Sequence, residues 1–483
     1  MILTLLILIP LVAGIAAMAI KGAAKGISLL SSVAVTVTSL LVLISINSFG
    51  PNGFIEWSMP WIPSLGSNIS LMGDGMAVVL CLLTGIVMLV TVITNWNKEV
   101  ERPGSFYGLM LLAQAGITGV FLASDALLFY FFWELALIPV YFLSSIWGGE
   151  KRIAVTFKFF VYTFVGSLML LAALIYLSLQ NPGGNSFAWQ NIIRAGASLP
   201  ADQQQWLFWL IFIAFAIKMP IFPLHTWQPD AYEQSPTPVT IILSALMVKM
   251  GIYGVVRWLL PVVPDAVAYW SDTVITLSVV GIVYASLLAI VQTDLKRLVA
   301  YSSIAHMGLM SAAAFANTDV AMHGLVIQMF NHGINIAGMW VIVSMVEQRW
   351  GTRDMRQLGG MANTAPLMTI ALVIISLANI ALPLTNGFIG EFMLFNGLFA
   401  SASPYHITFM VIAGLGIILG AVYTLNMVQR TAYGDAVAMK AGGDITRNEY
   451  IGLAIIIGLI IFLGVYPKPL LDMTTGVTNM VLP

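Results

Sequence analysis

Long apolar stretches separated by short polar segments run along almost the whole chain. A helix needs about 17 to 25 apolar residues to cross the hydrocarbon core of a bilayer. Runs of that length recur throughout, so the pattern predicts an all-α polytopic membrane protein with about fourteen transmembrane helices. The predicted crossings lie near residues 2–20, 27–47, 75–95, 106–123, 126–147, 156–179, 205–226, 238–260, 272–292, 298–316, 321–346, 365–400, 406–429 and 451–467.

Two of these crossings, the seventh and the twelfth, contain helix-breaking residues. AIKMPIFPLHTW (216–227) places Pro220 and Pro223 behind a run without charge, and ANIALPLTNGFIGEF (378–392) contains Pro383 and Gly387. Proline removes a backbone hydrogen bond, and inside a membrane the freed carbonyls need protein or water as partners. Interrupted helices at corresponding places in two halves are typical of inverted repeats in transporters.

The spacing of charged and polar residues supports such a repeat. Lys218 and Glu391 are 173 positions apart, and Glu134 and His306 are 172 positions apart. The alternative is that these two nearly equal spacings arise by chance among a few polar residues. We therefore predict N-terminal helices 1–3 over 1–104, a first repeat of helices 4–8 over 105–262, and an inverted second repeat of helices 9–13 over 263–430. Helix 14 and a tail would occupy 431–483.

Composition supports a membrane protein and excludes several other classes. The chain is 59% hydrophobic and only 8% charged, with a mean hydropathy of +0.93, whereas soluble domains have about 25% charged residues. The single cysteine, Cys81, excludes a disulfide framework and a cysteine-ligated iron–sulfur cluster. A net charge of −1 without a basic arm argues against nucleic-acid binding. No basic residue precedes the first apolar run, so we expect an uncleaved membrane helix there rather than a signal peptide.

The distribution of basic residues predicts the orientation in the membrane. Fifteen of the 20 Lys and Arg residues follow odd-numbered crossings, while only Arg194, Arg257 and Lys468 follow even-numbered ones. Short cytoplasmic loops carry an excess of Lys and Arg. The odd-numbered loops are therefore expected to face the cytoplasm, and both termini the opposite side.

Four charged residues lie well inside predicted helices: Glu134, Lys218, Lys249 and Glu391. A charge at the bilayer centre costs about 2.5–3.5 kcal/mol, and such residues usually face the protein interior and mark an ion path. A Glu–Lys pair about 6 Å apart is worth roughly 3 kcal/mol at an effective dielectric of about 20. Moving a proton against about 150 mV costs roughly 3.5 kcal/mol. Opening and closing one pair could therefore decide whether the lysine keeps its proton. The alternative is a structural ion pair.

Histidines inside the predicted crossings extend this set. His306 and His332 lie in crossings 10 and 11, and histidine titrates near physiological pH. Each alone would more often be a hydrogen-bonded core residue. His225 lines the first helix break, and His323 and His406 are interpreted as incidental. No matched histidine pair indicates haem, and no dinucleotide-binding fingerprint is present.

Five stretches carry a family resemblance: FFWELALIPVYFLSSIWG (131–148), KMPIFPLHTWQPDAYEQSPTPVTIILSALMVKMGIYGVVR (218–257), DLKRLVAYSSIAHMG (294–308), NHGINIAGMW (331–340) and GFIGEF (387–392). Their order and spacing, over about residues 70–430, resemble the antiporter-like membrane subunits of respiratory complex I, the NADH:quinone oxidoreductase. WELxLIP and KxPxxPxHxWxPDA are specific to that superfamily.

The resemblance implies roles for individual residues. By position, Glu134 matches the glutamate that pairs with the lysine here numbered Lys218, and Lys249 matches a connecting lysine. His306 and His332 match polar links to the second half-channel, and Glu391 matches the acidic residue of helix 12. Two sister subunits, L and N, usually have lysine at that last position. Tyr232 stands where the family commonly has histidine and Asn335 where it has a small residue, so no titrating role is assigned to the loop around Tyr232.

The resemblance also implies a function. The chain would translocate protons as a subunit of a proton-translocating NADH:quinone oxidoreductase, in the bacterial inner membrane beside chains L and N. It would carry no cofactor and no metal itself, with FMN, iron–sulfur clusters and quinone in partner subunits. The alternatives are a subunit of a Mrp-type sodium/proton antiporter or of a membrane-bound hydrogenase. A structural scaffold that conducts nothing is a further alternative.

Overall fold

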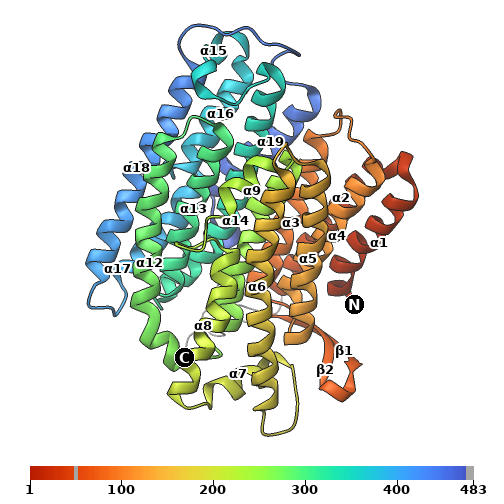
Figure 1. The fold of residues 1–483 in the computed structure, drawn as a ribbon, viewed down its shortest axis with the longest axis vertical. Helices are drawn as coiled ribbons and strands as arrows, with labels where there is room; N and C mark the ends of the chain where they lie inside the picture. The colour runs from red at the N-terminus through yellow and green to blue at the C-terminus, as the bar shows by residue number, and fades with distance from the viewer. Residues whose placement is uncertain (48–52, 475–483) are drawn as a thin grey trace.

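A computed structural model describes residues 1–47 and 53–474, and within them the chain is almost entirely helical (Figure 1). The long helices follow the predicted crossings. Their bounds are α1 Ile2–Ala19, α2 Ala24–Asn47, α3 Gly75–Thr94, α4 Pro103–Leu122, α5 Ala126–Trp147, α6 Arg152–Leu179, α8 Ala201–Lys218, α12 Pro264–Val291, α13 Leu295–Ala314, α14 Asp319–Trp350, α16 Pro366–Asn379, α17 Asn386–Phe399, α18 His406–Ala432 and α19 Arg447–Val465.

The predicted all-α membrane fold is confirmed. Among the described residues, 11 helices are long and apolar enough to cross a membrane. The other predicted crossings fall on α8, on α13, and on the pair α16 and α17. The eighth crossing is one continuous coil made of α10 (Thr237–Ile241), the π-helical η3 (Ile242–Met247), α11 (Val248–Gly254) and the π-helical η4 (Val255–Leu259).

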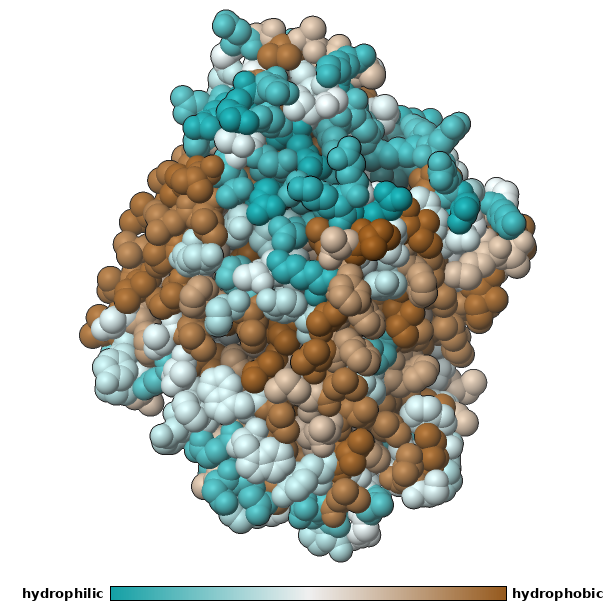
Figure 2. All heavy atoms as spheres, viewed as in Figure 1, coloured by the Kyte–Doolittle hydropathy of each residue, from teal (hydrophilic) through white to brown (hydrophobic). Residues whose placement is uncertain are grey.

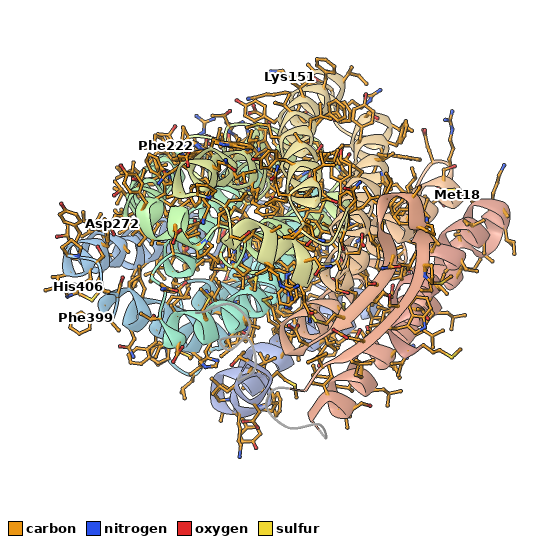
Figure 3. All side chains as sticks on the ribbon, turned by 90° about the horizontal axis from the view of Figure 1, so that it is seen from below. Met18, Lys151, Phe222, Asp272, Phe399 and His406 are labelled. Atoms are coloured by element: carbon orange, nitrogen blue, oxygen red, sulfur yellow. The ribbon has the colours of Figure 1, made fainter. Side chains whose placement is uncertain are left out.

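Hydrophilic residues gather at the two ends of the long axis, with an apolar band between them (Figure 2). Short α15 (Met361–Thr364) lies at the upper end, and short α7 (Trp189–Ala197) lies at the lower end with a hairpin (Figure 1). Seen from below, the helices extend from the N-terminal group, where Met18 is labelled, to the α17–α18 edge with Phe399 and His406 (Figure 3). An apolar belt between polar ends is the surface that a bilayer requires.

The chain begins at the hairpin end, and its last described helix, α20 (Lys468–Thr474), lies there as well. The Leu3 side chain lies against Gly73, and the backbone of Met473 lies against Gly75 at the start of α3. The start of α1 and the end of α20 therefore share one side of the molecule. This is the relative placement that an even number of crossings requires.

A β-hairpin between α2 and α3 was not predicted. Its strands, β1 (Ile55–Ile62) and β2 (Ser67–Gly73), pair antiparallel. Asp125, the N-cap of α5, accepts hydrogen bonds from Ser67 Oγ at 2.9 Å and from the Asn68 backbone N–H at 3.0 Å. It also accepts from the first backbone N–H groups of α5. One carboxylate thus fastens the hairpin and caps a transmembrane helix.

Arg257 corrects the assignment of basic residues to loops. It lies in η4, only 1% exposed, and forms an ion pair with Asp74, the N-cap of α3. Its Nε also donates to the Tyr253 hydroxyl at 3.2 Å. The guanidinium therefore packs between the eighth crossing and α3. Arg257 does not belong among the loop residues that were used to predict the orientation.

Candidate proton-transfer site

At the first helix break, α8 ends in the interior of the protein. The helix ends at Lys218, the chain turns through residues 219–227, and α9 (Gln228–Gln234) follows. The Trp227 indole N–H donates to the Ile217 carbonyl at 2.9 Å. A side chain from beyond the break therefore provides a partner to a carbonyl of the last helical turn, as the membrane interior demands. The break is held in place by protein contacts.

The second break, between α16 and α17, uses asparagines of α14 in the same way. Asn331 Nδ2 donates to the Asn386 carbonyl at 2.7 Å, and Asn335 Nδ2 donates to the Ala378 carbonyl at 3.2 Å. Between these ends, Ala381 and Leu384 have φ values of 55° and 73°, in the left-handed region. Such conformations cost about 1–3 kcal/mol each and persist where the surroundings impose them.

Lys218 and Glu134 lie near each other without direct contact. Lys218 is 2% exposed, and its Nζ lies 5.1 Å from the centre of the Trp133 ring, next to Glu134 on α5. Within the described residues, neither Lys218 Nζ nor Glu134 Oε1 has a hydrogen-bond partner in the protein, and no ion pair within 4 Å joins them. Electrostatic attraction still acts between them, so this is a separated pair rather than a closed one.

Lys249 and His332 form the first half of a polar row. Lys249 is fully buried, and its Nζ donates to the Ser244 carbonyl at 2.9 Å. The same Nζ lies 2.7 Å from Nδ1 of His332 on α14. Two positive charges this close repel by at least about 4 kcal/mol even at an effective dielectric of about 20. The two side chains are therefore not both positively charged at this distance.

His306 and Glu391 continue the row. The His306 ring, on α13, lies 5.4 Å from the His332 ring, and its Nδ1 lies 3.0 Å from Glu391 Oε1. Gln328, one turn before His332 on α14, donates to the same carboxylate oxygen at 3.4 Å. The order Lys249, His332, His306 and Glu391 thus joins four different helices at the centre of the bundle.

The two imidazole rings are suited to relay a proton, because only one nitrogen of each ring contacts the neighbouring lysine or glutamate. His332 Nδ1 contacts Lys249 and His306 Nδ1 contacts Glu391, while Nε2 of both rings lacks a protein partner among the residues described. A histidine accepts a proton at one nitrogen and releases another from the second. Because neither Nε2 contacts the other, transfer between them through a bridging water would complete a path from lysine to glutamate.

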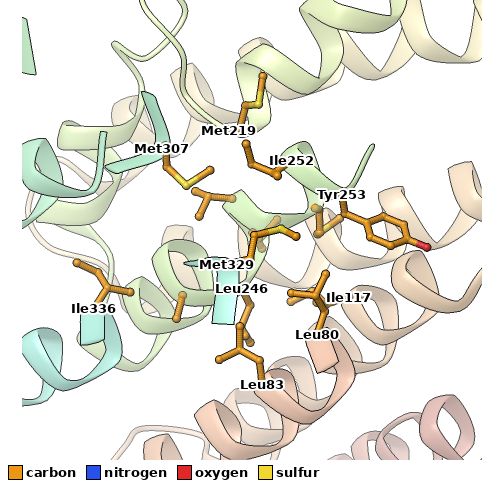
Figure 4. Close-up of a cluster of buried hydrophobic side chains, with 14 of the residues drawn as sticks. Leu80, Leu83, Ile117, Met219, Leu246, Ile252, Tyr253, Met307, Met329 and Ile336 are labelled. Atoms are coloured by element: carbon orange, nitrogen blue, oxygen red, sulfur yellow. The ribbon is translucent and has the colours of Figure 1, made fainter. Parts of the chain in front are cut away.

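A cluster of buried apolar side chains comes partly from the same chain segments as this row (Figure 4). Met219 follows Lys218, Leu246 and Ile252 flank Lys249, Met307 follows His306 and Met329 precedes His332, and all of them are buried. The chain segments that carry Lys218, Lys249, His306 and His332 thus also supply apolar side chains to this cluster. Low-polarity surroundings strengthen electrostatic interactions, so protonation of one group affects its neighbours strongly.

A small cavity adjoins the glutamate end of the row. It has a volume of about 30 Å³ and is lined by His306, Glu391, Asn379 and Tyr423, among others. The hydroxyl of Ser302 accepts from Asn379 Nδ2 at 3.1 Å and from Tyr423 Oη at 3.0 Å. Since about 10–15 Å³ accommodates one water, the cavity has room for water beside Glu391.

The structure places four of the predicted site residues in contact, namely Lys249, His332, His306 and Glu391, with Glu134 and Lys218 as a separate pair. His225 stacks on Phe222 in the first break, His323 contacts Thr474, and His406 contacts the Ser403 carbonyl. Sequence reasoning missed Gln328, Asn331, Ser302, Asn379 and Tyr423. The spacing of Gln328 and His332, four residues apart on one helix, was the available signal.

The family model of the transmembrane NADH:quinone oxidoreductase/Mrp antiporter proteins matches residues 123–426. This range contains every predicted site residue. The chain is also 35% identical to the NADH-quinone oxidoreductase subunit M of Pseudomonas aeruginosa, over 99% of this chain and 96% of that protein.

Solved structures with the same fold include two respiratory or transport assemblies. A chain of respiratory complex I from Thermus thermophilus is 25% identical, with a TM-score of 0.90 and full coverage of both chains. A chain of the Mrp complex from Dietzia sp. is 19% identical, with a TM-score of 0.87, covering 99% of this chain and 97% of that chain. The latter similarity concerns the fold alone.

Proposed function

Because this chain belongs to the family of NADH-quinone oxidoreductase M subunits, we propose that it moves protons across the membrane in step with electron transfer in its partner subunits. The observation that carries the proposal is the contact row Lys249, His332, His306 and Glu391. Buried titratable groups in contact across several helices are costly in a membrane and are typical of proton paths.

We infer that the separated pair controls proton supply to the row. With Lys218 drawn toward Glu134, the carboxylate stabilises the charged lysine, which then keeps its proton. When the attraction weakens, buried Lys218 favours its neutral form and passes the proton toward Lys249. From Lys249 the proton moves to His332 Nδ1, from His332 Nε2 to His306 Nε2, and from His306 Nδ1 to Glu391. Each step exchanges one N–H or O–H bond for another, and each imidazole then has its hydrogen on the opposite ring nitrogen. Before the next proton enters, Glu391 releases its proton and both rings return to their first tautomer by exchange with water.

The proposal includes the setting of the chain. It is a multi-pass membrane protein; we place it in a bacterial inner membrane with its termini on the non-cytoplasmic side, beside the sister chains L and N. NADH oxidation, FMN, iron–sulfur clusters and quinone belong to other subunits in this proposal, and the chain itself contributes a proton path to a translocase.

A pumping assay with isosteric variants tests the proposal. The whole oxidoreductase with Lys249→Met, reconstituted in vesicles, should pump protons at least about ten times more slowly than wild type. Raising the free-energy barrier of one step by about 1.4 kcal/mol slows that step tenfold. Lys218→Ala and Glu134→Ala should also pump slowly. Lys21→Met, an exposed lysine outside the bundle core, is the matched control. Wild-type pumping by normally assembled Lys249→Met, Lys218→Ala and Glu134→Ala complexes would contradict the proposal and support a scaffold.

Sodium/proton exchange is the second candidate, favoured only by the fold shared with the Mrp complex. It predicts that ΔpH formation by the reconstituted complex depends on sodium. Equal pumping in sodium-free and sodium-containing buffers, driven by NADH, would support the proton path alone.

A further inference from the structure

Lys98, in the short connection between α3 and α4, is an unusual lysine. Its side chain turns inward, and Nζ donates to the hydroxyl of Ser344 on α14 at 2.8 Å. Lys25 of α2 holds the connection from behind, because its Nζ donates to the carbonyls of Trp96 and Lys98 at 2.7 Å each. The backbone is thus fixed so that the Lys98 ammonium points between α3 and α14.

The carboxylates around Lys98 have other partners. Glu449, on α19, forms a bidentate pair with Arg349, with N···O distances of 3.2 and 2.7 Å. Glu347, on α14, pairs with Lys296 at 3.3 Å and with Arg353 at 3.4 Å. Within the described part of the chain, Lys98 has no carboxylate within 4 Å, so its ammonium contacts a neutral hydroxyl. Such an ammonium releases a proton more easily than one in a closed ion pair.

Two hollows in this region share one lining residue, and the inner one is lined by Lys98. The outer one is a surface hollow of about 520 Å³, lined by exposed Glu150 and Lys151 and by Lys296, Glu347 and Thr237. The inner one, of about 10 Å³, is lined by Lys98, Ser344, Ile241 and also Thr237. Since about 10–15 Å³ holds one water, the inner hollow is the size of a single water site. Thr237, at the start of α10, is common to both.

The inner hollow adjoins the start of the eighth crossing, which further along carries Ser244 and Lys249. Ile241 lines it, and Ser244 lies three residues further, about 5 Å along a helix. The Ser244 carbonyl accepts from Lys249, and its hydroxyl has no protein partner within the described residues.

We infer that Lys98 is a proton-uptake residue that loads the row at Lys249 by a route between α3, α10 and α14, separate from Lys218. The Lys98 ammonium gives its proton to water in the inner hollow, which passes it along Ser244 to Lys249. The neutral amine then takes a proton from water in the outer hollow. This inference rests on the proposed function and adds a second supply to the row.

The protonation of Lys98 is suited to this role. Burial lowers its pKa from 10.5 to about 8, although Glu449 and Glu347 raise it, and Lys296 and Arg349 lower it further. These are the charged groups that face it from α19, α14 and α13. At pH 7 the lysine is mostly protonated, and at pH 9 it is mostly neutral, so the supply of protons should fall across that interval.

Lys98→Arg separates uptake from a structural role. Arginine retains the charge and the hydrogen-bond donors but does not release its proton in proteins. We expect the reconstituted complex with Lys98→Arg to pump about as slowly as Lys98→Met, at least threefold below wild type, with normal assembly. Lys21→Arg makes the same change at an exposed site and should pump normally. Pumping restored by Lys98→Arg would overturn the inference.

The pH profile provides the second readout. Wild-type pumping should decline as the pH on the α3–α4 side rises through about 8, and Lys98→His should move this decline to lower pH, because histidine titrates near 6.5. An unchanged profile in Lys98→His would overturn the inference. If Lys249→Met abolishes pumping while Lys98→Arg and Lys98→His behave as wild type, the uptake route fails and the proposed function stands.

Discussion

Titratable side chains at the centre of this protein meet their neighbours at hydrogen-bond distance. Lys249 Nζ and His332 Nδ1 are 2.7 Å apart, and His306 Nδ1 and Glu391 Oε1 are 3.0 Å apart. Each contact joins two groups that can both bind a proton. In the proposed path, a residue therefore acts through having a titratable atom at this position, and the sign of its charge matters less.

Substitutions at Glu391 test that view. Glu391→Lys should pump faster than Glu391→Ala, because lysine retains a titratable group that His306 Nδ1 can contact. Glu391→Ala should lose about tenfold in rate, since the row then ends at His306. Proton pumping by both complexes, normalised to their NADH oxidation, gives the comparison. Equal and complete loss in both variants would count against a relay at this position.

The charged members of the site could be predicted from the sequence, whereas their neutral neighbours could not. A lysine or glutamate inside an apolar run is conspicuous because of its cost in a membrane. Ser302, Asn379 and Tyr423 are ordinary polar residues in sequence, and only their convergence on one hydroxyl reveals a cluster. The separation of Lys218 from Glu134 is likewise a matter of packing that spacing does not determine.

Broken helices are the elements that bring backbone groups and charges together. The breaks in α8–α9 and α16–α17 were predicted from proline and glycine, but their partners were not. Asn335, which stands out in the sequence as a departure from the family pattern, donates to the Ala378 carbonyl at the second break. Its amide stabilises the irregular backbone that positions α17 and Glu391.

Asn335→Ala should therefore destabilise the second break. The Ala378 carbonyl also accepts from the Ala381 backbone N–H at 3.2 Å, so loss of the Asn335 hydrogen bond costs about 0.5–1.5 kcal/mol, and the thermal midpoint of the chain in its complex should fall. Asn181→Ala, at an exposed loop, is the matched control and should change nothing measurable. A midpoint equal to wild type for Asn335→Ala would show that the carbonyl needs no such partner.

The hairpin is the element that the apolar pattern did not predict, because β1 and β2, of eight and seven residues, are much shorter than a membrane-crossing helix. Its attachment depends on Asp125. We expect Asp125→Ala to lower stability by about 1–3 kcal/mol and to speed proteolysis at the hairpin. Asp125→Asn retains one acceptor oxygen and should be milder. Identical proteolysis rates in the alanine variant and wild type would refute this attachment.

The whole molecule has polar ends and an apolar belt (Figure 2), and 11 of the described helices are long and apolar enough to cross a membrane. Its orientation is testable by labelling, since Cys81 is fully buried. Asn185→Cys should react with an impermeant maleimide on the non-cytoplasmic side. Lys151→Cys should react only after the cytoplasmic side is opened. The reverse pattern would invert the orientation.

The central claim is that Lys249 and Glu391 belong to one proton path, and a double-mutant comparison of pumping tests it most directly. The complexes with Lys249→Met, with Glu391→Gln and with both changes are reconstituted side by side, and initial pumping rates are measured at equal complex content. Groups in series along one path are non-additive, so the double variant should pump as slowly as the slower single variant. Losses that multiply, about tenfold each to about a hundredfold together, would show that the two residues act independently and would contradict a single row.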